Sequence, residues 1–213
     1  MLFQHVFRSA TTEPMPLLHE RISILREAGA ILSEHFSDRP ANIVLRANGS
    51  ASALVNLLVE YFPSFRDEAL FHGKTVRLYK RAQIFVADTW ACFNGTSFGT
   101  FRDIDTLTMF ADYRIPQMLR SLGCLLYSPP LEGQIKRLQR IRSGENREVE
   151  IRGCSIWCVE LLRREIVRRH PEAQESLNAV LIDFFLYDTC KEREKMGEEE
   201  DMLPHHRTRS IWY

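Results

Sequence analysis

Residues 16–36 carry the pattern that decides the fold class, PLLHERISILREAGAILSEHF. Apolar side chains recur here at spacings of three and four residues, among them Leu18, Ile22, Leu32 and Phe36. Because an α-helix has about 3.6 residues per turn, this spacing places them on one face. The segment is therefore predicted to form an amphipathic helix that packs against other helices.

The same helical pattern continues through most of the chain in shorter segments. Thr75–Tyr79 is the exception, because it alternates like a very short strand or an extended coil. Helices are expected from Ser50 to Tyr61, over residues 81–93, from Asp103 or Asp105 to Ala111, from Pro116 to Gly123, from Ser128 to Ile141, through Ile156 to near Pro171, and over residues 176–192. The sequence thus predicts an all-α fold, a single helical domain over residues 1–213, with an acidic spacer at residues 193–203.

The charge balance limits the class of partner. The chain of 213 residues has 28 basic and 28 acidic side chains and a formal net charge of zero. A protein that binds a nucleic-acid polymer gains affinity from a basic surface, whereas a single nucleotide needs only a local basic pocket. Composition therefore disfavours DNA or RNA as the partner and is compatible with a small-molecule substrate.

The segment composition also predicts where the protein works. No apolar run reaches the roughly 18 residues of a membrane span, and no signal-peptide pattern opens the chain. Cys154 and Cys158 are one helical turn apart and are interpreted as packing thiols of a reducing compartment, with a metal pair as the alternative. We expect a cytoplasmic protein with no membrane contact, no cofactor and no metal.

Lys80 and Asp112 are the first candidates for chemistry, because each charge lies within an apolar stretch. A desolvated charge costs several kcal/mol unless it is paired or hydrogen-bonded. Asp112 is expected in the last turn of a helix that ends before Ile115-Pro116, where exposed carbonyls disfavour an anion and raise its pKa unless a cation such as Lys80 or Arg114 offsets this. The alternative is a structural ion pair of Asp112 with Arg114 or Lys80.

Asp183 is the third candidate, since it lies in the middle of the apolar segment Val180–Asp188. An acid in this position is either paired internally or directed at a ligand. The C-terminal tail, residues 204–213, concentrates basic and aromatic side chains, including His206 and Arg207. It could dock and offer imidazole and guanidinium donors to a phosphate. Alternatively, its aromatic residues dock while its basic groups stay solvated.

These segments resemble those of the queuosine salvage protein family. The resemblance runs from about Met15 to Tyr213, and its motifs are Phe65-Arg66-Asp67, residues 79–84 (YKRAQI), 87–90 (ADTW), 109–114 (MFADYR), 150–153 (EIRG), Asp183 in its aromatic helix, and His206-Arg207 before an aromatic C-terminus. It implies a queuosine 5'-phosphate N-glycosylase/hydrolase, which releases queuine for reuse in transfer RNA. It also implies an all-helical fold similar to helix-hairpin-helix DNA glycosylases.

The resemblance assigns roles to particular positions. Asp112 corresponds to the catalytic carboxylate that attacks or electrostatically stabilises the anomeric carbon, and Lys80 to a lysine that keeps this acid ionised. Asp183 resembles the acid that recognises the base or its cyclopentenediol amine. The other substrate-binding positions that it implies are Tyr113 and Phe184, which could stack on the base, and Arg114, Asp88, His206 and Arg207.

One departure from the family concerns the N-terminus. Family members carry a further N-terminal helical segment that helps to close the pocket, and this chain is expected to be the C-terminal portion of such a domain. An alternative function is therefore a non-catalytic remnant that binds queuosine nucleotides or a protein partner. A DNA glycosylase is a third possibility, which the zero net charge disfavours.

Overall fold

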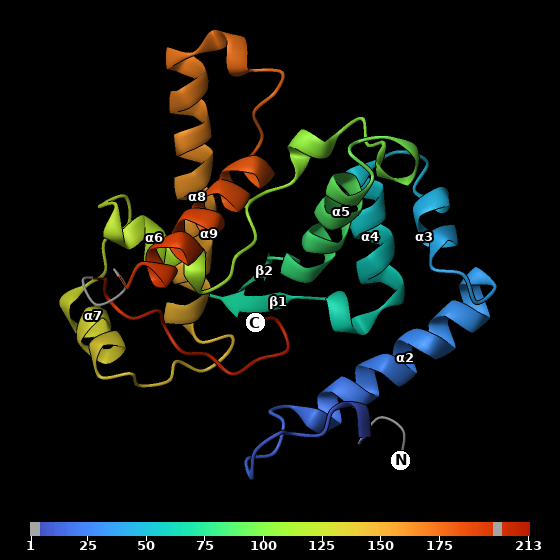
Figure 1. Ribbon diagram of the computed structural model, residues 1–213, viewed down its shortest axis with the longest axis horizontal. Coiled ribbons are helices and arrows are strands. Elements are labelled where there is room, and N and C mark those ends of the chain that lie inside the picture. The colour runs from blue at the N-terminus through green and yellow to red at the C-terminus, as the bar shows by residue number, and fades with distance from the viewer. Residues whose placement is uncertain (1–4, 198–201) are drawn as a thin grey trace.

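The computed structural model describes residues 5–197 and 202–213, and helices make up most of this part of the chain. Figure 1 shows two groups of helices with a two-stranded hairpin between them. The first group contains α2 (Leu18–Phe36), α3 (Ala41–Arg46), α4 (Ala51–Tyr61) and α5 (Lys80–Cys92). The second contains α6 (Arg114–Ser121), α7 (Pro129–Lys136), α8 (Asn146–Arg169) and α9 (Ala179–Lys195).

Each group of helices has its own apolar core. Phe36, Leu54 and Val86 are buried in the first, where α2, α4 and α5 pack together. Leu119, Val159 and Leu186 are buried in the second, from α6, α8 and α9. The largely helical prediction is therefore confirmed, while the similarity to helix-hairpin-helix DNA glycosylases stays a prediction.

The two-stranded hairpin is the part of the fold that departs from the predicted all-helical architecture. Strand β1 (Glu68–Phe71) pairs antiparallel with β2 (Lys74–Arg77), with Glu68 opposite Arg77 and Phe71 opposite Lys74. The alternation after Lys74 is thus confirmed as a strand, but β1 and the short helix α3 were not predicted. Both are too short to show a clear period in the sequence.

The helix predicted from Asp103 or Asp105 to Ala111 is wrong. Only a short 3₁₀ turn, Ile104–Thr106, forms there, and the chain then runs without regular structure as far as Tyr113. Asp103 instead accepts hydrogen bonds from the backbone N–H groups of Ala51 and Ser52 at the start of α4. Its carboxylate therefore does bind N–H groups at the start of a helix. That helix, however, lies some fifty residues earlier in the chain.

Side chains of two helices replace the missing helical hydrogen bonds of the segment after this turn. The backbone N–H of Thr108 donates to Gln83 Oε1 of α5 at 2.8 Å. The N–H of Phe110 donates to Asp183 Oδ2 of α9 at 2.9 Å. The segment 107–113 therefore bridges the two groups of helices, and it carries Asp112 between them.

Other boundaries agree with the prediction to within a few residues. Ser50 caps α4 by accepting from the N–H of Ala53, as predicted. The predicted helix from Ser128 to Ile141 ends early, at Lys136. The acidic spacer expected at residues 193–203 overlaps the end of α9 and lies partly outside the described residues.

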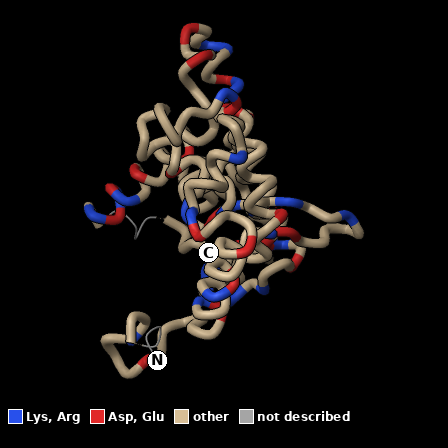
Figure 2. Tube along the Cα trace, turned by 90° about the vertical axis from the view of Figure 1, so that its right-hand side faces the viewer, with Lys and Arg blue, Asp and Glu red and all other residues tan. Residues whose placement is uncertain are grey.

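No helix in the described ranges is long and apolar enough to cross a membrane. The cytoplasmic location stays a prediction. Figure 2 shows acidic and basic residues interleaved at the upper end of the molecule, where α8 ends.

Candidate active site

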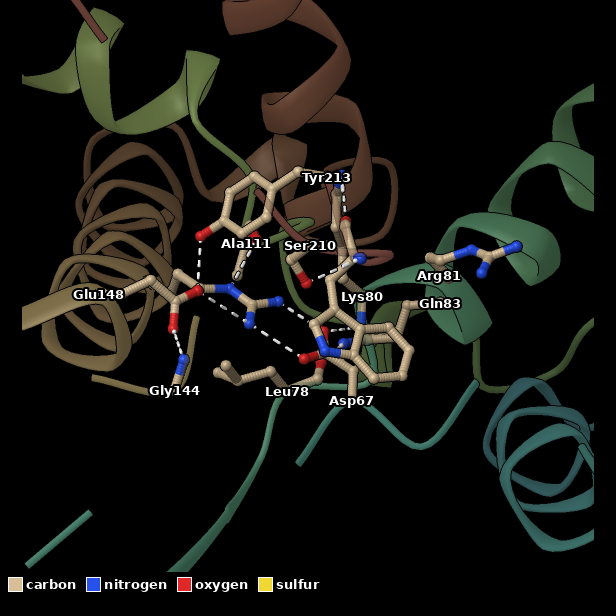
Figure 3. A network of polar contacts seen from close by, with 12 residues as sticks. Asp67, Leu78, Lys80, Arg81, Gln83, Ala111, Gly144, Glu148, Ser210 and Tyr213 are labelled. Carbon is tan, nitrogen blue, oxygen red and sulfur yellow. Dashed lines mark hydrogen bonds and ion pairs between the residues drawn. The ribbon is translucent and has the colours of Figure 1, made fainter. Parts of the chain in front are cut away.

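Lys80 is the first residue of α5, and its side chain is buried with a relative exposure of 9%. Its Nζ donates a hydrogen bond to the carbonyl oxygen of Trp212 at 3.1 Å and lies 5.8 Å from the ring centroid of Tyr213. Figure 3 shows the tail lying over this lysine, whereas the neighbouring Arg81 points away from it. The C-terminal tail therefore docks directly on the candidate catalytic lysine.

Asp67 fixes the turn that leads into Lys80. Its backbone carbonyl accepts from the N–H groups of Leu78 and Tyr79, and its Oδ2 accepts from the N–H of Lys80 at 3.2 Å. Tyr79 has a φ of 48°, a left-handed conformation that is unfavourable for a bulky residue. Three hydrogen bonds to one residue hold this turn, and with it the direction of the Lys80 side chain.

Asp112 lies before a helix rather than at the end of one. The chain starts α6 at Arg114, and Asp112 Oδ1 accepts from the N–H groups of Arg114 and Ile115 at 2.9 and 3.0 Å. The predicted position in a last helical turn is therefore wrong, because residues 107–113 form no helix and α6 begins only after Asp112.

The pKa of Asp112 is nevertheless raised, as predicted, but for another reason. Burial raises it, and the N–H of Ile115, the charge of Lys80 and the N–H of Arg114 oppose this effect. The start of a helix favours an anion, whereas its end disfavours one. The helix terminus thus stabilises the charged form of Asp112, and loss of hydration disfavours it.

Asp183 of α9 is buried, with a relative exposure of 5%. Burial raises the pKa of its carboxyl to about 7, and Asp112 contributes to the rise, while the N–H of Phe110 and the charge of Lys80 oppose it. Burial and the charge of Arg152 lower the pKa of Lys80, against the attraction of Asp112, Asp67 and Asp183. The structure thus brings these three predicted residues into one electrostatically coupled cluster.

A second buried network is centred on Arg152 of α8 and joins Asp67, Glu148 and Tyr213, which Figure 3 labels. Its guanidinium contacts both carboxylate oxygens of Asp67 and also pairs with Glu148. Glu148 Oε1 accepts from the hydroxyl of Tyr213 at 2.6 Å. Asp67, Glu148 and Arg152 are each only 1% exposed.

Two neighbouring cavities open over the tail. The first, the Lys80 cavity, has a volume of about 530 Å³ and is lined by Lys80, Arg81, Asp88, the apolar side chains of α2 and α5, and residues 210–213. The second, the arginine cavity, has a volume of about 500 Å³, and its lining includes Arg21, Arg140, Arg207, Arg209, His205 and His206 but no Asp or Glu side chain. Arg21, Ser210 and Tyr213 line both.

Asp112 and Asp183 line neither cavity, so Lys80 is the member of the cluster that reaches one. Within residues 5–197 and 202–213, no group of three or more His, Cys, Asp or Glu side chains is arranged to hold a metal ion.

The remaining predicted site residues divide between the cluster, the cavities and the core. Tyr113 lines the arginine cavity, with its ring 4.6 Å from that of His205. The guanidinium of Arg114 contacts Glu194 and Gln117, on the side of α9. Phe184 packs against the first core, with its ring 6.1 Å from that of Phe110. Stacking of Phe184 on a base stays a prediction.

Asp88 lines the Lys80 cavity from α5, and partial burial raises its pKa. His206 is 2% exposed, and its Nε2 lies 3.2 Å from the hydroxyl of Tyr213. Burial lowers the pKa of His206 to about 4, so it is neutral near pH 7 and offers no imidazolium charge. Arg207 is exposed at the arginine cavity, and its carbonyl accepts from the N–H of Ile141.

Sequence reasoning missed the residues that hold the site together. Asp67 lies in a motif that carries the family resemblance but received no role. The run of alternating charges Glu148–Arg152 was predicted only to tether elements through ion pairs, which the pairs of Arg152 with Asp67 and Glu148 confirm. Arg21 and Arg140 come from segments far from the basic tail of residues 204–213, and no local pattern links them to it. The signal for the Arg152 network was that run of alternating charges, in which Glu148 and Arg152 are four residues apart.

The queuosine salvage protein family model matches residues 1–213. The chain belongs to this family. Its sequence is 48% identical over 213 residues to a queuosine 5'-phosphate N-glycosylase/hydrolase from Mus musculus, an alignment that spans 98% of the chain and 62% of the mouse protein. Proteins with the same name from Bos taurus and Schizosaccharomyces pombe are 45% and 42% identical, over 99% and 100% of the chain and 62% and 61% of their own lengths.

The chain therefore spans somewhat more than three fifths of the length of these relatives. Within the queuosine salvage family, the resemblance noted in the motifs is confirmed over the whole sequence. The roles of the individual site residues stay predictions.

Proposed function

We propose that this chain hydrolyses the N-glycosidic bond of queuosine 5'-monophosphate, releasing queuine and ribose 5-phosphate for salvage into transfer RNA. The observation that carries this proposal is the buried cluster of Lys80, Asp112 and Asp183 in a chain similar to named queuosine 5'-phosphate N-glycosylase/hydrolases. A cluster of tuned, buried charges next to a cavity is typical of a catalytic site.

Asp112 supplies the negative charge that this reaction needs. When the bond between the anomeric carbon and the base breaks, its electron pair leaves with the base and the sugar becomes oxocarbenium-like. A nearby carboxylate stabilises the developing positive charge, either as an ion or as a nucleophile. The N–H groups of Arg114 and Ile115 and the charge of Lys80 favour the ionised form of Asp112.

Asp183 suits recognition of the base. With a pKa of about 7, it is present both as a carboxylate and as a carboxylic acid at neutral pH. The carboxylate accepts from the N–H donors of a guanine-like base and pairs with the secondary ammonium of queuosine. Lys80 meanwhile lines the cavity, where its ammonium can contact ribose oxygens.

The arginine cavity suits the 5'-phosphate. A phosphate dianion is bound best by guanidinium groups, which Arg21, Arg140, Arg207 and Arg209 supply. Two buried polar atoms of the tail, His206 Nδ1 and Thr208 Oγ1, have no hydrogen-bond partner among the described residues. A nucleotide with its ribose near Lys80 could place its phosphate in the neighbouring cavity.

A second candidate is a nucleotide-binding protein without turnover. Two observations favour it. Asp112 and Asp183 line neither cavity, and the Lys80 ammonium already donates a hydrogen bond to the backbone carbonyl of Trp212. Under this alternative the cavities bind queuosine 5'-monophosphate, but the carboxylates do not reach the anomeric carbon.

The deciding experiment is to incubate the chain with queuosine 5'-monophosphate and measure free queuine. Asp112→Asn should lower kcat by about 10³-fold or more and leave the helical circular dichroism signal unchanged. Asp105→Asn, at an exposed position outside the site, is the matched control and should retain wild-type activity. Nucleotide binding without queuine release by the wild type, even at high enzyme concentration, would favour the second candidate.

A further inference from the structure

Arg152 contacts both segments that carry the proposed catalytic pair. Its two terminal nitrogens bind the two carboxylate oxygens of Asp67, a bidentate arrangement in which Nη1 lies 2.9 Å from Oδ1. Its Nε donates to the carbonyl oxygen of Ala111 at 2.9 Å. One rigid, planar guanidinium thus joins the residue before Asp112 to the residue that fixes the turn at Lys80.

On the first side, the link runs through Asp67 to Lys80. The same carboxylate that binds Arg152 accepts from the N–H of Lys80, and the carbonyl of Asp67 holds Leu78 and Tyr79. Because Tyr79 is in the unfavourable left-handed region, this turn would relax without its hydrogen bonds. The direction of the Lys80 side chain therefore depends on where Arg152 holds Asp67.

On the second side, the link runs through the peptide group between Ala111 and Asp112. The carbonyl of Ala111 belongs to the peptide plane that includes the N–H of Asp112, so the Arg152 Nε bond orients the backbone at the catalytic acid. The start of α6 holds the carboxylate itself, through Arg114 and Ile115. The position of Asp112 thus depends on both contacts.

We propose that Arg152 is a positioning residue, which sets the separation and relative orientation of Lys80 and Asp112 by binding Asp67 and the Ala111 carbonyl together. This role rests on the proposed function of the cluster. Glu148 and the Tyr213 hydroxyl complete the network, since Glu148 binds Arg152 at 3.3 Å and Tyr213 at 2.6 Å.

A purely stabilising role does not explain this arrangement well. A buried ion pair returns little net stability, because desolvation of its charges offsets their attraction, and replacing all of its members together by well-packed apolar residues is often as stable. Arg152 is 1% exposed and brings two equally buried acids with it. A fixed geometry is a benefit that an apolar side chain at this position could not supply.

The test is Arg152→Lys, which keeps the positive charge but lacks the planar fork needed to bind Asp67 and Ala111 together. We expect kcat for queuosine 5'-monophosphate to fall by about 10²-fold, as a misplacement of about 1 Å can cause, while KM changes less than about threefold. The pKa of Lys80, measured by NMR, should also fall, because Asp112 would no longer be held near it.

Arg163→Lys on the same helix is the matched control, because Arg163 pairs with Glu160 at the surface and should leave kcat and the Lys80 pKa unchanged. Asp67→Asn is the second variant, and it tests the proposal in the event that Arg152→Lys does not fold. It breaks the same link from the other side, so we expect a similar loss of kcat and no further loss in the double variant.

Wild-type kcat and an unchanged Lys80 pKa in a folded Arg152→Lys variant would overturn the proposal, as would a rise in KM alone. If the wild type itself releases no queuine, the proposed function fails, but the comparison of Lys80 pKa values still decides whether Arg152 positions Lys80 against Asp112.

Discussion

The two ends of α8 carry the same kind of ion pair in opposite surroundings. Glu148 and Arg152 are four residues apart near its start, and Glu160 and Arg164 are four apart near its end. The first pair has side-chain exposures of 1% and 2%, whereas the second has 26% and 58%. Neighbouring segments decide this difference, because Asp67, which precedes β1, and Tyr213 of the tail contact only the first pair.

The difference shows what burial changes in an ion pair. An exposed pair is hydrated and mobile and contributes about 0.2–1 kcal/mol. A buried pair adds little more to the net free energy of unfolding. Separating its two charges in the protein interior is costly, however, so the pair keeps one geometry. The start of α8 can therefore position the proposed catalytic cluster, whereas the pairs at its other end stay exposed to solvent.

Arg152→Met should give the largest effect on stability and would test the comparison most severely. We expect the free energy of unfolding to fall by about 3–5 kcal/mol, because Asp67 and Glu148 would stay buried without their cation. Arg164→Met on the same helix should cost less than about 1 kcal/mol. Chemical denaturation at pH 7 measures both, and equal losses would remove the distinction between the two ends of α8.

Asp183 extends the comparison to acids, because its folded-state pKa of about 7 lies above that of an unfolded aspartate. The folded state therefore binds the proton more tightly, and the stability from this group is full below about pH 4 and lost as pH rises to about 7. At about 1.4 kcal/mol per pKa unit, the loss is up to about 4 kcal/mol.

Asp183→Asn should remove this slope and raise the stability measured at pH 8, since an amide oxygen can still accept from the N–H of Phe110. Unfolding free energies from pH 4.5 to 8 test this, with Asp105→Asn as the surface control. A slope that persists in Asp183→Asn would assign the pH dependence to another group.

Glu160 should show the opposite and smallest effect. Hydrogen bonds from Arg163 and Arg164 lower its pKa to about 2, so its contribution to stability is present above about pH 4.5 and is lost as pH falls towards 2. Because the site is partly exposed, Glu160→Gln should cost less than about 1 kcal/mol at pH 7, and less still in about 0.5 M NaCl. Denaturation at both salt concentrations measures this, and a loss as large as that of Arg152→Met would contradict the comparison.

The helices of the fold were predictable because they depend on local period and on caps within a few residues. The segment 16–36 and the Ser50 cap were read correctly for this reason. The region 103–113 was not, because its hydrogen bonds go to Gln83, Asp183 and the start of α4, all distant in sequence. Its apolar residues also fit a helical period, which made the wrong prediction reasonable.

The sequence predicted which residues form the candidate site better than it predicted the causes of their pKa shifts. Lys80, Asp112 and Asp183 were selected because charged residues in apolar stretches are costly, and the structure brings all three together. The cause assigned to the Asp112 pKa had the wrong sign for the helix terminus, since the residue precedes α6. Sequence position alone does not tell which end of which helix a residue will face.

The sequence by itself determined the helical class, the zero net charge and the membership in the queuosine salvage family, because composition, local period and motifs are properties of the chain alone. Only the tertiary structure decided that Glu148 and Arg152 are buried while Glu160 and Arg164 are exposed. Burial depends on which distant segments cover a helix face, here Asp67 and the C-terminal tail. That covering turns one of two similar ion pairs into the link between Lys80 and Asp112.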